Sequence, residues 1–154
     1  MLQKKILFNI TEDWFFLSHF LSRALSAQKE GFEIFVCCNE TNKKKVIENY
    51  GIKFIRLPYK RPNINPLYEF YILIRLILIV IKEKPDIIFH LAAQSIVSES
   101  FYNPLETFGT NVIGSVNILE SVRINKIPNL VYITSDKCYL NLDKRSSFKE
   151  SDIL

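Results

Sequence analysis

Short apolar runs alternate along this chain with longer segments in which apolar residues recur every three or four positions. The runs lie at residues 5–10, 33–38, 52–56, 86–91 and 129–134. Each run is almost continuously apolar, which is typical of strands that are buried on both faces of a parallel sheet. The pattern therefore predicts five parallel strands.

The segments between the runs have helical spacing. The predicted helices lie at residues 14–29, 41–49, 66–83 and 104–124. In the first helix, apolar side chains recur at Leu17, Phe20, Leu21, Ala24 and Ala27, so one face can lie on the sheet. Gly31 is expected to end this helix, and Asn39 or Thr41 to cap the second. Pro66 and Pro104 are expected in the first turns of the other two helices, where proline is tolerated.

The helix predicted at 104–124 has the clearest apolar stripe. The stripe consists of Leu105, Phe108, Val112, Val116, Leu119 and Val122. Gly109 and Gly114 interrupt this helix, and each costs about 1 kcal/mol of helix propensity relative to alanine. Glycine within a helix usually has a packing or functional reason, so we expect a close approach to the sheet or to a ligand there.

The alternation of strands and crossover helices predicts the fold class. We expect an α/β protein, a Rossmann-like doubly wound parallel sheet of about five strands in the order 3-2-1-4-5. In such a sheet, ligands bind at the carboxyl ends of the strands where the order reverses, here strands 1 and 4. The 154 residues are enough for one domain and too few for two of ordinary size, so a single domain over residues 1–154 is predicted.

The most apolar stretch, residues 71–81, has two interpretations. It is 11 residues long and contains Arg75, whereas a membrane-spanning helix needs about 20 apolar residues. A buried helix is therefore the main expectation, and a weak contact with a membrane surface is the alternative.

Charge and cysteine content narrow the class of partners. The net charge is +4, and residues 1–89 hold the whole excess of basic residues. The only tight basic run, at 43–45, lies where a solvated helix would begin, so no nucleic-acid partner is predicted. Cys37, Cys38 and Cys138 have no metal-ligand spacing, so no metal site is predicted, and reduced thiols in the cytoplasm are expected.

The second half of the chain resembles a known enzyme family. The resemblance is carried by "FHLAAQSIVSESFYNPLETFGTNVIGSVNILESVR" at 89–123 and "VYITSDKCY" at 131–139. Residues 90–139 resemble extended short-chain dehydrogenase/reductases that act on nucleotide sugars, and especially the NAD-dependent CDP-glucose 4,6-dehydratases. The resemblance implies NAD as cofactor, a nucleotide sugar as substrate and the dehydration of a sugar as the reaction.

The first half resembles a different family. "NITEDWFFLSH" at 9–19, "GFEIFVCC" at 31–38 and "GIKFIRLPYKRPNINPLYEF" at 51–70 are similar to the amino-terminal lobe of GT-B-type glycosyltransferases that build surface polysaccharides. We therefore interpret the chain as a hybrid, with a glycosyltransferase-like half at 1–88, a dehydratase-like half at 89–140 and a frayed tail at 141–154. The shared strand near residues 84–90 is the expected junction.

The first strand-to-helix junction contains no glycine. A dinucleotide pyrophosphate needs free backbone N–H groups at a helix start and the close approach that glycine permits. Residues 9–14 read "NITEDW", so Glu12 and Asp13 occupy the helix start themselves. Thr11 to Asp13 are expected to act as a helix cap, and an acceptor contact through Asp13 or His19 is the alternative.

The candidate catalytic residues follow the fifth strand, where groups of such sheets meet their ligands. By the resemblance, Ser135 would bind the 4-oxygen of the sugar, Asp136 would act as the acid for the departing 6-hydroxyl, and Lys137 would take the position of the acid–base partner. On its own, Ser-Asp-Lys after a strand is also a common turn or helix cap. The resemblance adds Asn111, which in the family organises the active-site tyrosine and lysine.

The resemblance also implies a path for the cofactor. Ala92, Ala93 and Thr134 match positions along which the NAD of the family runs, whereas His90 is expected to be a packed strand residue. The Tyr-x-x-x-Lys pair of the family does not occur within the 154 residues. We therefore expect this chain to be inactive as a dehydratase and its NAD binding to be weak or lost.

Two other functions stay open. One is an acceptor-binding or membrane-surface role of the first half in polysaccharide assembly, with Arg56, Lys60 and Arg61 as the binding residues. The other is a non-catalytic product of gene rearrangement that folds because its halves share one architecture. A homodimer formed through the helix at 104–124 is expected if the apolar outer positions of that helix remain uncovered.

Overall fold

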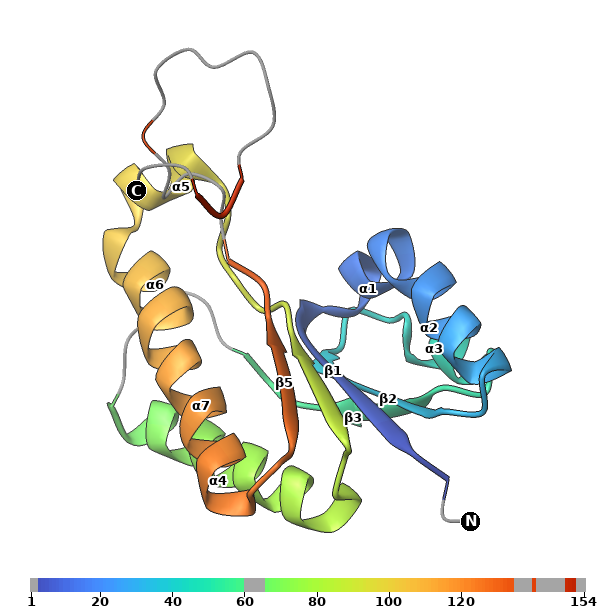
Figure 1. Ribbon diagram of the computed structural model, residues 1–154. Helices are drawn as coiled ribbons and strands as arrows, with labels where there is room; N and C mark the ends of the chain where they lie inside the picture. Colours follow the sequence, from blue (N-terminus) through green and yellow to red (C-terminus); the bar gives the residue numbers. More distant parts are fainter. Residues whose placement is uncertain (1–2, 60–65, 135–139, 141–148, 152–154) are drawn as a thin grey trace.

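The predicted sheet is present. The computed structural model describes residues 3–59, 66–134, 140 and 149–151. The strands are β1 (Lys5–Glu12), β2 (Glu33–Asn39), β3 (Lys53–Arg56), β4 (Ile87–His90) and β5 (Asn129–Tyr132). They form one parallel sheet in the order β3-β2-β1-β4-β5, which confirms the predicted fold class and topology (Figure 1).

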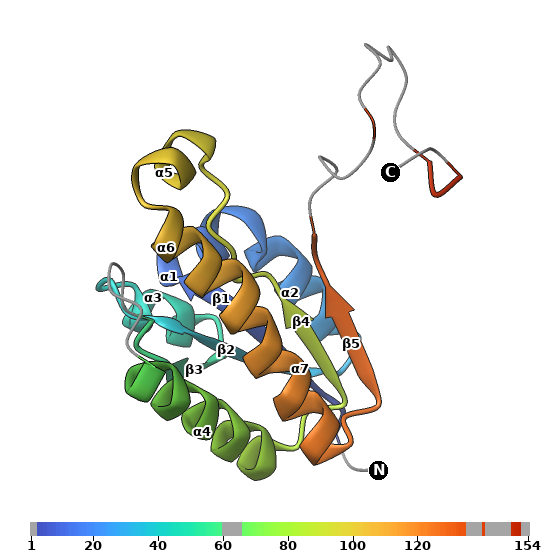
Figure 2. The ribbon, with the colours of Figure 1, turned by 90° about the vertical axis from the view of Figure 1, so that its left-hand side faces the viewer.

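Helices cover both faces of this sheet. They are α1 (Asp13–His19), α2 (Leu21–Lys29), α3 (Lys44–Asn49), α4 (Pro66–Glu83), α5 (Val97–Tyr102), α6 (Pro104–Phe108), the π-helical turn η1 (Gly109–Ile113) and α7 (Gly114–Asn125). One face carries α1, α2 and α3, and the other carries α4 and the α6–η1–α7 rod (Figures 1 and 2). Connections that alternate between the faces give the doubly wound arrangement.

Each face of the sheet has its own apolar core because side chains alternate along a strand. On β1, Phe8 points to the layer of α1 to α3 and packs against Phe16. Leu7 points to the other layer, where Leu76 of α4 and Ile118 of α7 are buried with it. The continuous apolar runs of the sequence are thus explained by burial on two faces.

The prediction of one continuous helix at 14–29 is wrong. The helix breaks at Phe20 into α1 and α2. Near the break, the Ser18 hydroxyl donates to the Trp14 and Phe15 carbonyls, and the Arg23 guanidinium donates to the His19 carbonyl at 2.7 Å. Such side-chain bonds compete with the backbone ladder of a helix. Gly31, with φ +89°, then ends α2 as predicted.

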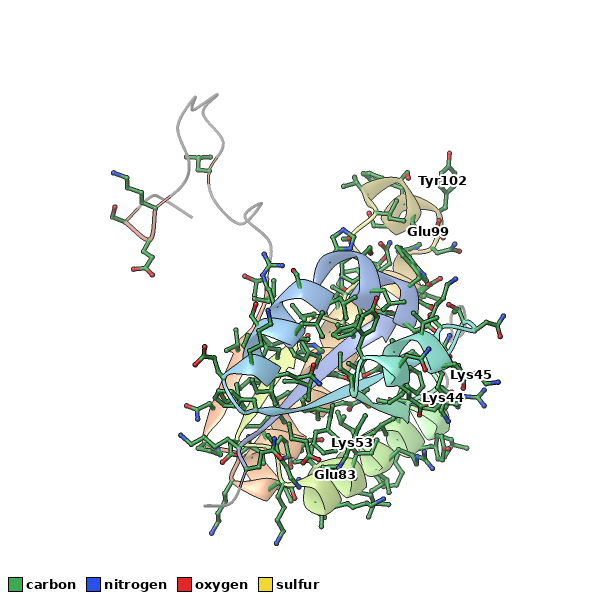
Figure 3. All side chains as sticks on the ribbon, turned by 90° about the vertical axis from the view of Figure 1, so that its right-hand side faces the viewer. Lys44, Lys45, Lys53, Glu83, Glu99 and Tyr102 are labelled. Carbon is green, nitrogen blue, oxygen red and sulfur yellow. The ribbon has the colours of Figure 1, made fainter. Side chains whose placement is uncertain are left out.

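The second predicted helix begins later than expected. The helix α3 begins at Lys44. Lys43 occupies the N-cap position, and its side chain makes no capping hydrogen bond. Neither Asn39 nor Thr41 is therefore the cap. Lys44 and Lys45 extend outward from α3 in Figure 3, with Lys45 exposed and Lys44 half-buried, as expected for a largely solvated basic run.

The helix predicted at 104–124 exists as a rod, but its apolar stripe faces outward except at Val122, which packs against the core. Leu105, Phe108, Val112, Val116 and Leu119 are all at least 49% exposed. The face that is buried contains Gly109, Asn117, Ile118 and Ser121 instead. The stripe predicted the helix correctly and identified its outer face rather than its inner one. α5 was not predicted.

Candidate functional site

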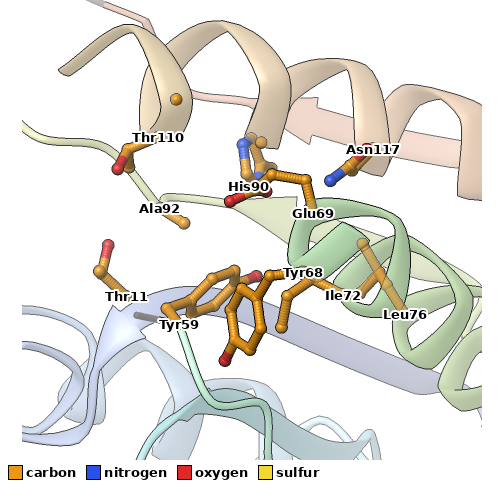
Figure 4. A pocket seen from close by; sticks show the side chains of 12 residues that line it. Thr11, Tyr59, Tyr68, Glu69, Ile72, Leu76, His90, Ala92, Thr110 and Asn117 are labelled. Carbon is orange, nitrogen blue, oxygen red and sulfur yellow. The ribbon is translucent and has the colours of Figure 1, made fainter. Parts of the chain in front are cut away.

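A cavity lies at the carboxyl ends of β1 and β4, where the strand order reverses. Its volume is about 40 Å³, and it lies between the sheet, α4 and the η1–α7 rod (Figure 4). The lining residues are Thr11, Tyr59, Tyr68, Glu69, Ile72, Leu76, His90, Ala92, Gly109, Thr110, Gly114 and Asn117. The cavity therefore occupies the position at which the sequence predicts a ligand.

A chain of hydrogen bonds links three segments beside the cavity. The Tyr59 hydroxyl donates to Oδ1 of Asn9 at 2.7 Å. Nδ2 of Asn9 then faces Nδ1 of His90 at 3.0 Å. Since an amide nitrogen can only donate, Nδ1 of His90 must be the acceptor, and the ring proton of the neutral imidazole is on Nε2.

Burial keeps His90 neutral. The side chain is 3% exposed, and its ring lies 5.0 Å from the ring of Tyr132 between centroids. Loss of hydration lowers the pKa of His90 to about 4, because burial disfavours the imidazolium. Nε2 of His90 has no hydrogen-bond partner within the part of the chain that the structure describes.

Two further polar groups belong to the same cavity. Asn117 of α7 is 6% exposed, and its Nδ2 has no partner among the described residues. Glu69 comes from the first turn of α4, and burial raises the pKa of its carboxyl above the usual value. The lining of the cavity thus includes His90, Asn117 and the carboxyl group of Glu69, and the rest of its walls are mainly apolar.

The junction of β1 and α1 has no loop. β1 ends at Glu12, and α1 begins at Asp13, the next residue. The Asp13 carboxylate is fully buried and accepts from the backbone N–H groups of Thr41 at 2.7 Å and Lys43 at 3.0 Å, and also from the Thr41 hydroxyl. Asp13 therefore accepts hydrogen bonds from backbone N–H groups of the segment before α3. This contact connects the end of β1 to the segment that follows β2.

The sequence-predicted site residues fall into two groups. Ser135, Asp136 and Lys137 lie outside the described residues, as does Cys138. Of the positions expected to follow the cofactor, Ala92 is buried and lines the cavity, whereas Ala93 and Thr134 are exposed. The proposed roles of these residues stay predictions.

Asn111 has a clear structural contact. It lies in η1, its Oδ1 accepts from the Gln94 N–H at 2.8 Å, and its Nδ2 donates to the Gln94 carbonyl at 2.9 Å. This pair of bonds fastens the π-helical turn to the segment that follows β4. The two bonds thus connect the segment that contains Ala92 to the helical wall that contains Gly109 and Gly114.

Sequence reasoning missed Asn9, Tyr59, Glu69 and Asn117. They lie on β1, in the segment after β3, on α4 and on α7, far apart along the chain, so no local motif could have found them. Gly109 and Gly114 did carry a signal, because glycine in a predicted helix indicated a close approach, and both line the cavity. His90 is a packed strand residue, as expected, and lines the cavity as well.

Within the described residues, no group of three His, Cys, Asp or Glu side chains is arranged to hold a metal ion. Among the same residues, no helix has the length and apolar character needed to cross a membrane. Cys37 and Cys38 are buried free thiols of β2.

Two family models match the chain, and each covers more than half of it. The model of GDP-mannose 4,6 dehydratase matches residues 74–153, and the model described as glycosyl transferase 4-like matches residues 5–101. The matches overlap in the region of α4 and β4, so the two resemblances seen in the sequence are confirmed.

Individual relatives match the second half of the chain. CDP-glucose 4,6-dehydratase of Salmonella typhimurium is 46% identical over 70 residues, which are 45% of this chain and 20% of that protein. UDP-glucose 4-epimerase of Mycoplasma genitalium is 32% identical over 71 residues, 46% of this chain and 21% of that protein. The matched segments thus span about a fifth of the length of these relatives.

Solved structures share the fold over nearly the whole chain. UDP-glucose-4-epimerase from Stenotrophomonas maltophila, solved with bound NAD, superimposes with a TM-score of 0.71 at 19% identity and covers 99% of this chain and 43% of that one. The epimerase from Brucella ovis, also in complex with NAD, gives a TM-score of 0.70 at 18% identity, over 97% of this chain and 41% of its own.

The sheet order and the cavity at its switch point define a Rossmann-like α/β protein. The chain belongs to the nucleotide-sugar dehydratase and epimerase family that the GDP-mannose 4,6 dehydratase model describes, and through residues 5–101 also to the glycosyl transferase 4-like family.

Proposed function

We propose that the chain is a hybrid Rossmann-like domain of surface-polysaccharide sugar metabolism that does not bind NAD where its dehydratase relatives do and is inactive as a 4,6-dehydratase. Residues 1–88 form the glycosyltransferase-like half, and residues 89–140 form the dehydratase-like half with a nucleotide sugar as the inherited substrate. The family matches that meet in α4 and β4 support this division.

The observation that carries the proposal is the direct passage from β1 into α1. With Glu12 in the strand and Asp13 in the helix, no glycine turn presents free N–H groups to a pyrophosphate. A phosphate near the half-buried Glu12 would also meet a like charge, which costs about 1 kcal/mol at 4 Å in water and about 4 kcal/mol near a protein surface. Both effects oppose the binding of NAD at the junction of β1 and α1.

Calorimetry with NAD and an assay for the 4-keto product from CDP-glucose test this proposal. We expect no saturable NAD binding and no turnover, while an active full-length CDP-glucose 4,6-dehydratase measured in parallel gives both. Micromolar NAD binding by this chain, or any 4-keto sugar, would overturn the proposal.

We further propose that the outward apolar stripe on α6, η1 and α7 pairs with the same stripe of a second copy. The rod exposes five large apolar side chains in one line. Exposure of such a patch to water is unfavourable, and a patch of this kind often marks a protein–protein contact. Leu119→Glu, in the centre of α7, is expected to give a monomer in light scattering. Val46→Glu on α3, a similarly exposed position, is the matched control and should leave the mass unchanged. An original chain that is already monomeric would contradict this pairing.

The alternative function is binding to a membrane surface or a lipid-linked acceptor. Its support is α4, whose apolar residues Leu67, Phe70 and Leu78 are at least 54% exposed and whose Arg75 lies near the carbonyl of Arg56. Flotation with anionic vesicles tests it, with Arg56, Lys60 and Arg61 neutralised together. Lys60 and Arg61 lie outside the described residues. Binding that is unaffected by this triple change would remove the electrostatic part of the alternative.

We place the protein in the cytoplasm, where reduced thiols persist. The buried free thiols of Cys37 and Cys38 are compatible with this location. Cell fractionation tests it, and recovery of the chain from an extracytoplasmic fraction would contradict it.

A further inference from the structure

One edge of the sheet, at β5, has unpaired backbone groups. In the part of the chain that the structure describes, β5 pairs with β4 alone. The Ile133 N–H donates to the His90 carbonyl at 3.1 Å, so the backbone of Ile133 faces β4. Backbone groups of successive strand residues point to alternate sides, and those of Leu130 and Tyr132 therefore point away from β4. Such an edge can pair with another strand.

The two edges of the sheet differ in charge. β3, at the opposite edge, begins with Lys53 and ends with Arg56. Charged side chains, and lysine in particular, protect a sheet edge from pairing with another chain. At the β5 edge, by contrast, residues 127–135 contain no charged side chain. The edge at β3 is thus protected, whereas the edge at β5 is not.

The side chains of β5 add an exposed apolar surface to this edge. Tyr132 points to the layer of α4 and α7, where its hydroxyl contacts the Ser115 hydroxyl. Because side chains alternate along a strand, Val131 and Ile133 point to the opposite face, where they are 37% and 51% exposed. Exposed apolar side chains on an unprotected edge favour association with another strand.

The apolar stripe of α7 adjoins the same edge. Ser115 is on the side of α7 that contacts β5, and Leu119 of the stripe lies four positions further along the helix. Residues four positions apart are neighbours on a helix surface. Figure 2 shows β5 as the outer strand, with α7 running beside it on one face of the sheet. The unpaired edge and the exposed stripe are therefore parts of one flank of the molecule.

We propose that β5 pairs antiparallel with β5 of a second copy, so that the two sheets become one continuous sheet. The arrangement rests on the stripe pairing proposed above and specifies its geometry. A two-fold axis perpendicular to the sheet keeps the α7 helices of both copies on the same face and brings them side by side. A second copy thus covers both the edge and the stripe, whereas a single peptide strand would cover the edge alone. Since β5 is uncharged, no like charges meet when it lies against itself.

The outward backbone groups determine the register of this pairing. Leu130 of one copy exchanges two hydrogen bonds with Tyr132 of the other, and the two-fold axis generates the reverse pair. Val131 then lies opposite Val131 of the second copy, in a non-hydrogen-bonded pair whose Cα atoms are about 4.5 Å apart. Pro128, which precedes β5, has no N–H group and limits the ladder to the strand itself.

Disulfide cross-linking tests the register. The variant is Val131→Cys in a Cys138→Ser background, since Cys138 lies outside the described residues and Cys37 and Cys38 are buried. Cα atoms about 4.5 Å apart are within the range of a disulfide, so mild oxidation should give a linked dimer on non-reducing electrophoresis.

Ile133→Cys in the same background is the matched control. In the proposed register its two copies are about 13 Å apart along the strands, too far for a disulfide. We therefore expect little cross-linking of this variant. Absence of a linked dimer with Val131→Cys, or equal cross-linking of both variants, would overturn the proposal.

A charge at the same position tests the association itself. Val131→Lys places like charges opposite each other at the two-fold axis, so light scattering should give half the mass of the original dimer. Val131→Thr retains a β-branched side chain and should stay dimeric. If Val131→Lys stayed dimeric while Leu119→Glu became monomeric, the stripe pairing would hold and the pairing of β5 would be overturned. A monomeric original chain would overturn both.

Discussion

Replacing Asp13 by alanine tests the contact that joins β1 to the segment before α3. Its carboxylate is fully buried and receives two backbone N–H groups and one hydroxyl group. A hydrogen bond to a charged group contributes about 1.5–3 kcal/mol. Thr41 and Lys43 are exposed, so water can reach their N–H groups in the variant and the lower value applies. Two such bonds give an expected loss of about 3 kcal/mol.

That loss is a large fraction of the 5–15 kcal/mol that typically stabilises a domain. Urea unfolding followed by circular dichroism measures it. With a typical slope of about 1.5 kcal/mol per M, the midpoint should fall by about 2 M. Asp13→Asn should lower the free energy of unfolding by less, about 1–2 kcal/mol, because the amide oxygen can still accept the N–H bonds without the charge.

Glu12→Ala is the matched control. Glu12 is the neighbouring carboxylate, and its only hydrogen bond found among the described residues is a long one of 3.5 Å from Nδ2 of Asn39. Glu12→Ala should lower the free energy of unfolding by less than about 0.5 kcal/mol, as for an ordinary surface substitution. If Asp13→Ala cost less than about 1 kcal/mol, or no more than Glu12→Ala, the proposed role of the buried carboxylate would be refuted.

Three further predictions concern other parts of the chain. Because burial lowers the pKa of His90 from 6.5 to about 4, the unfolded state takes up its proton first. The contribution of His90 to the free energy of unfolding is full above pH 6.5 and should fall by up to about 3 kcal/mol between pH 6.5 and 4. Urea unfolding at several pH values measures this slope, and the His90→Gln variant should lack it. Equal slopes in the two proteins would contradict the prediction. Burial raises the pKa of Cys37 to about 12, so iodoacetamide at neutral pH should label Cys37 only after unfolding, as read by peptide mass spectrometry, and rapid labelling of the native chain would be inconsistent with its burial. Lys126 ends α7 with φ +51°, so Lys126→Gly should raise the free energy of unfolding by up to about 1 kcal/mol and Lys126→Ala should not; equal effects would count against backbone strain.

The strands and their order could be predicted because the signal for them is local. Each apolar run is long enough to require burial on two faces, and crossover helices permit few topologies. The break at Phe20 could not be predicted in the same way. Helical spacing continues through it, and the bonds of Ser18 and Arg23 to nearby carbonyls decide the local geometry.

The candidate site shows the same division. Ala92 and the helix glycines could be found from local sequence, and both contribute to the cavity wall. Asn9, Tyr59 and Glu69 could not, because only the fold brings them beside His90, from β1, from the segment after β3 and from α4. A stripe of period 3.6 also fixes a helical face without saying which layer will cover it, so the outward orientation of Val116 and Leu119 was not accessible from the pattern.

The sequence by itself determined the parallel sheet, the absence of glycine at the first junction and the resemblance of each half to a different family. Those features depend on residues that are adjacent in the chain. Only the tertiary structure decided that Asp13 binds the segment before α3, that most of the helical stripe remains exposed and that His90 and Asn117 line one cavity. The physical reason is that these contacts join residues far apart in the chain, which folding alone brings together. Asp13 binds Thr41 and Lys43, 28 and 30 positions away, and His90 contacts Asn9, 81 positions away.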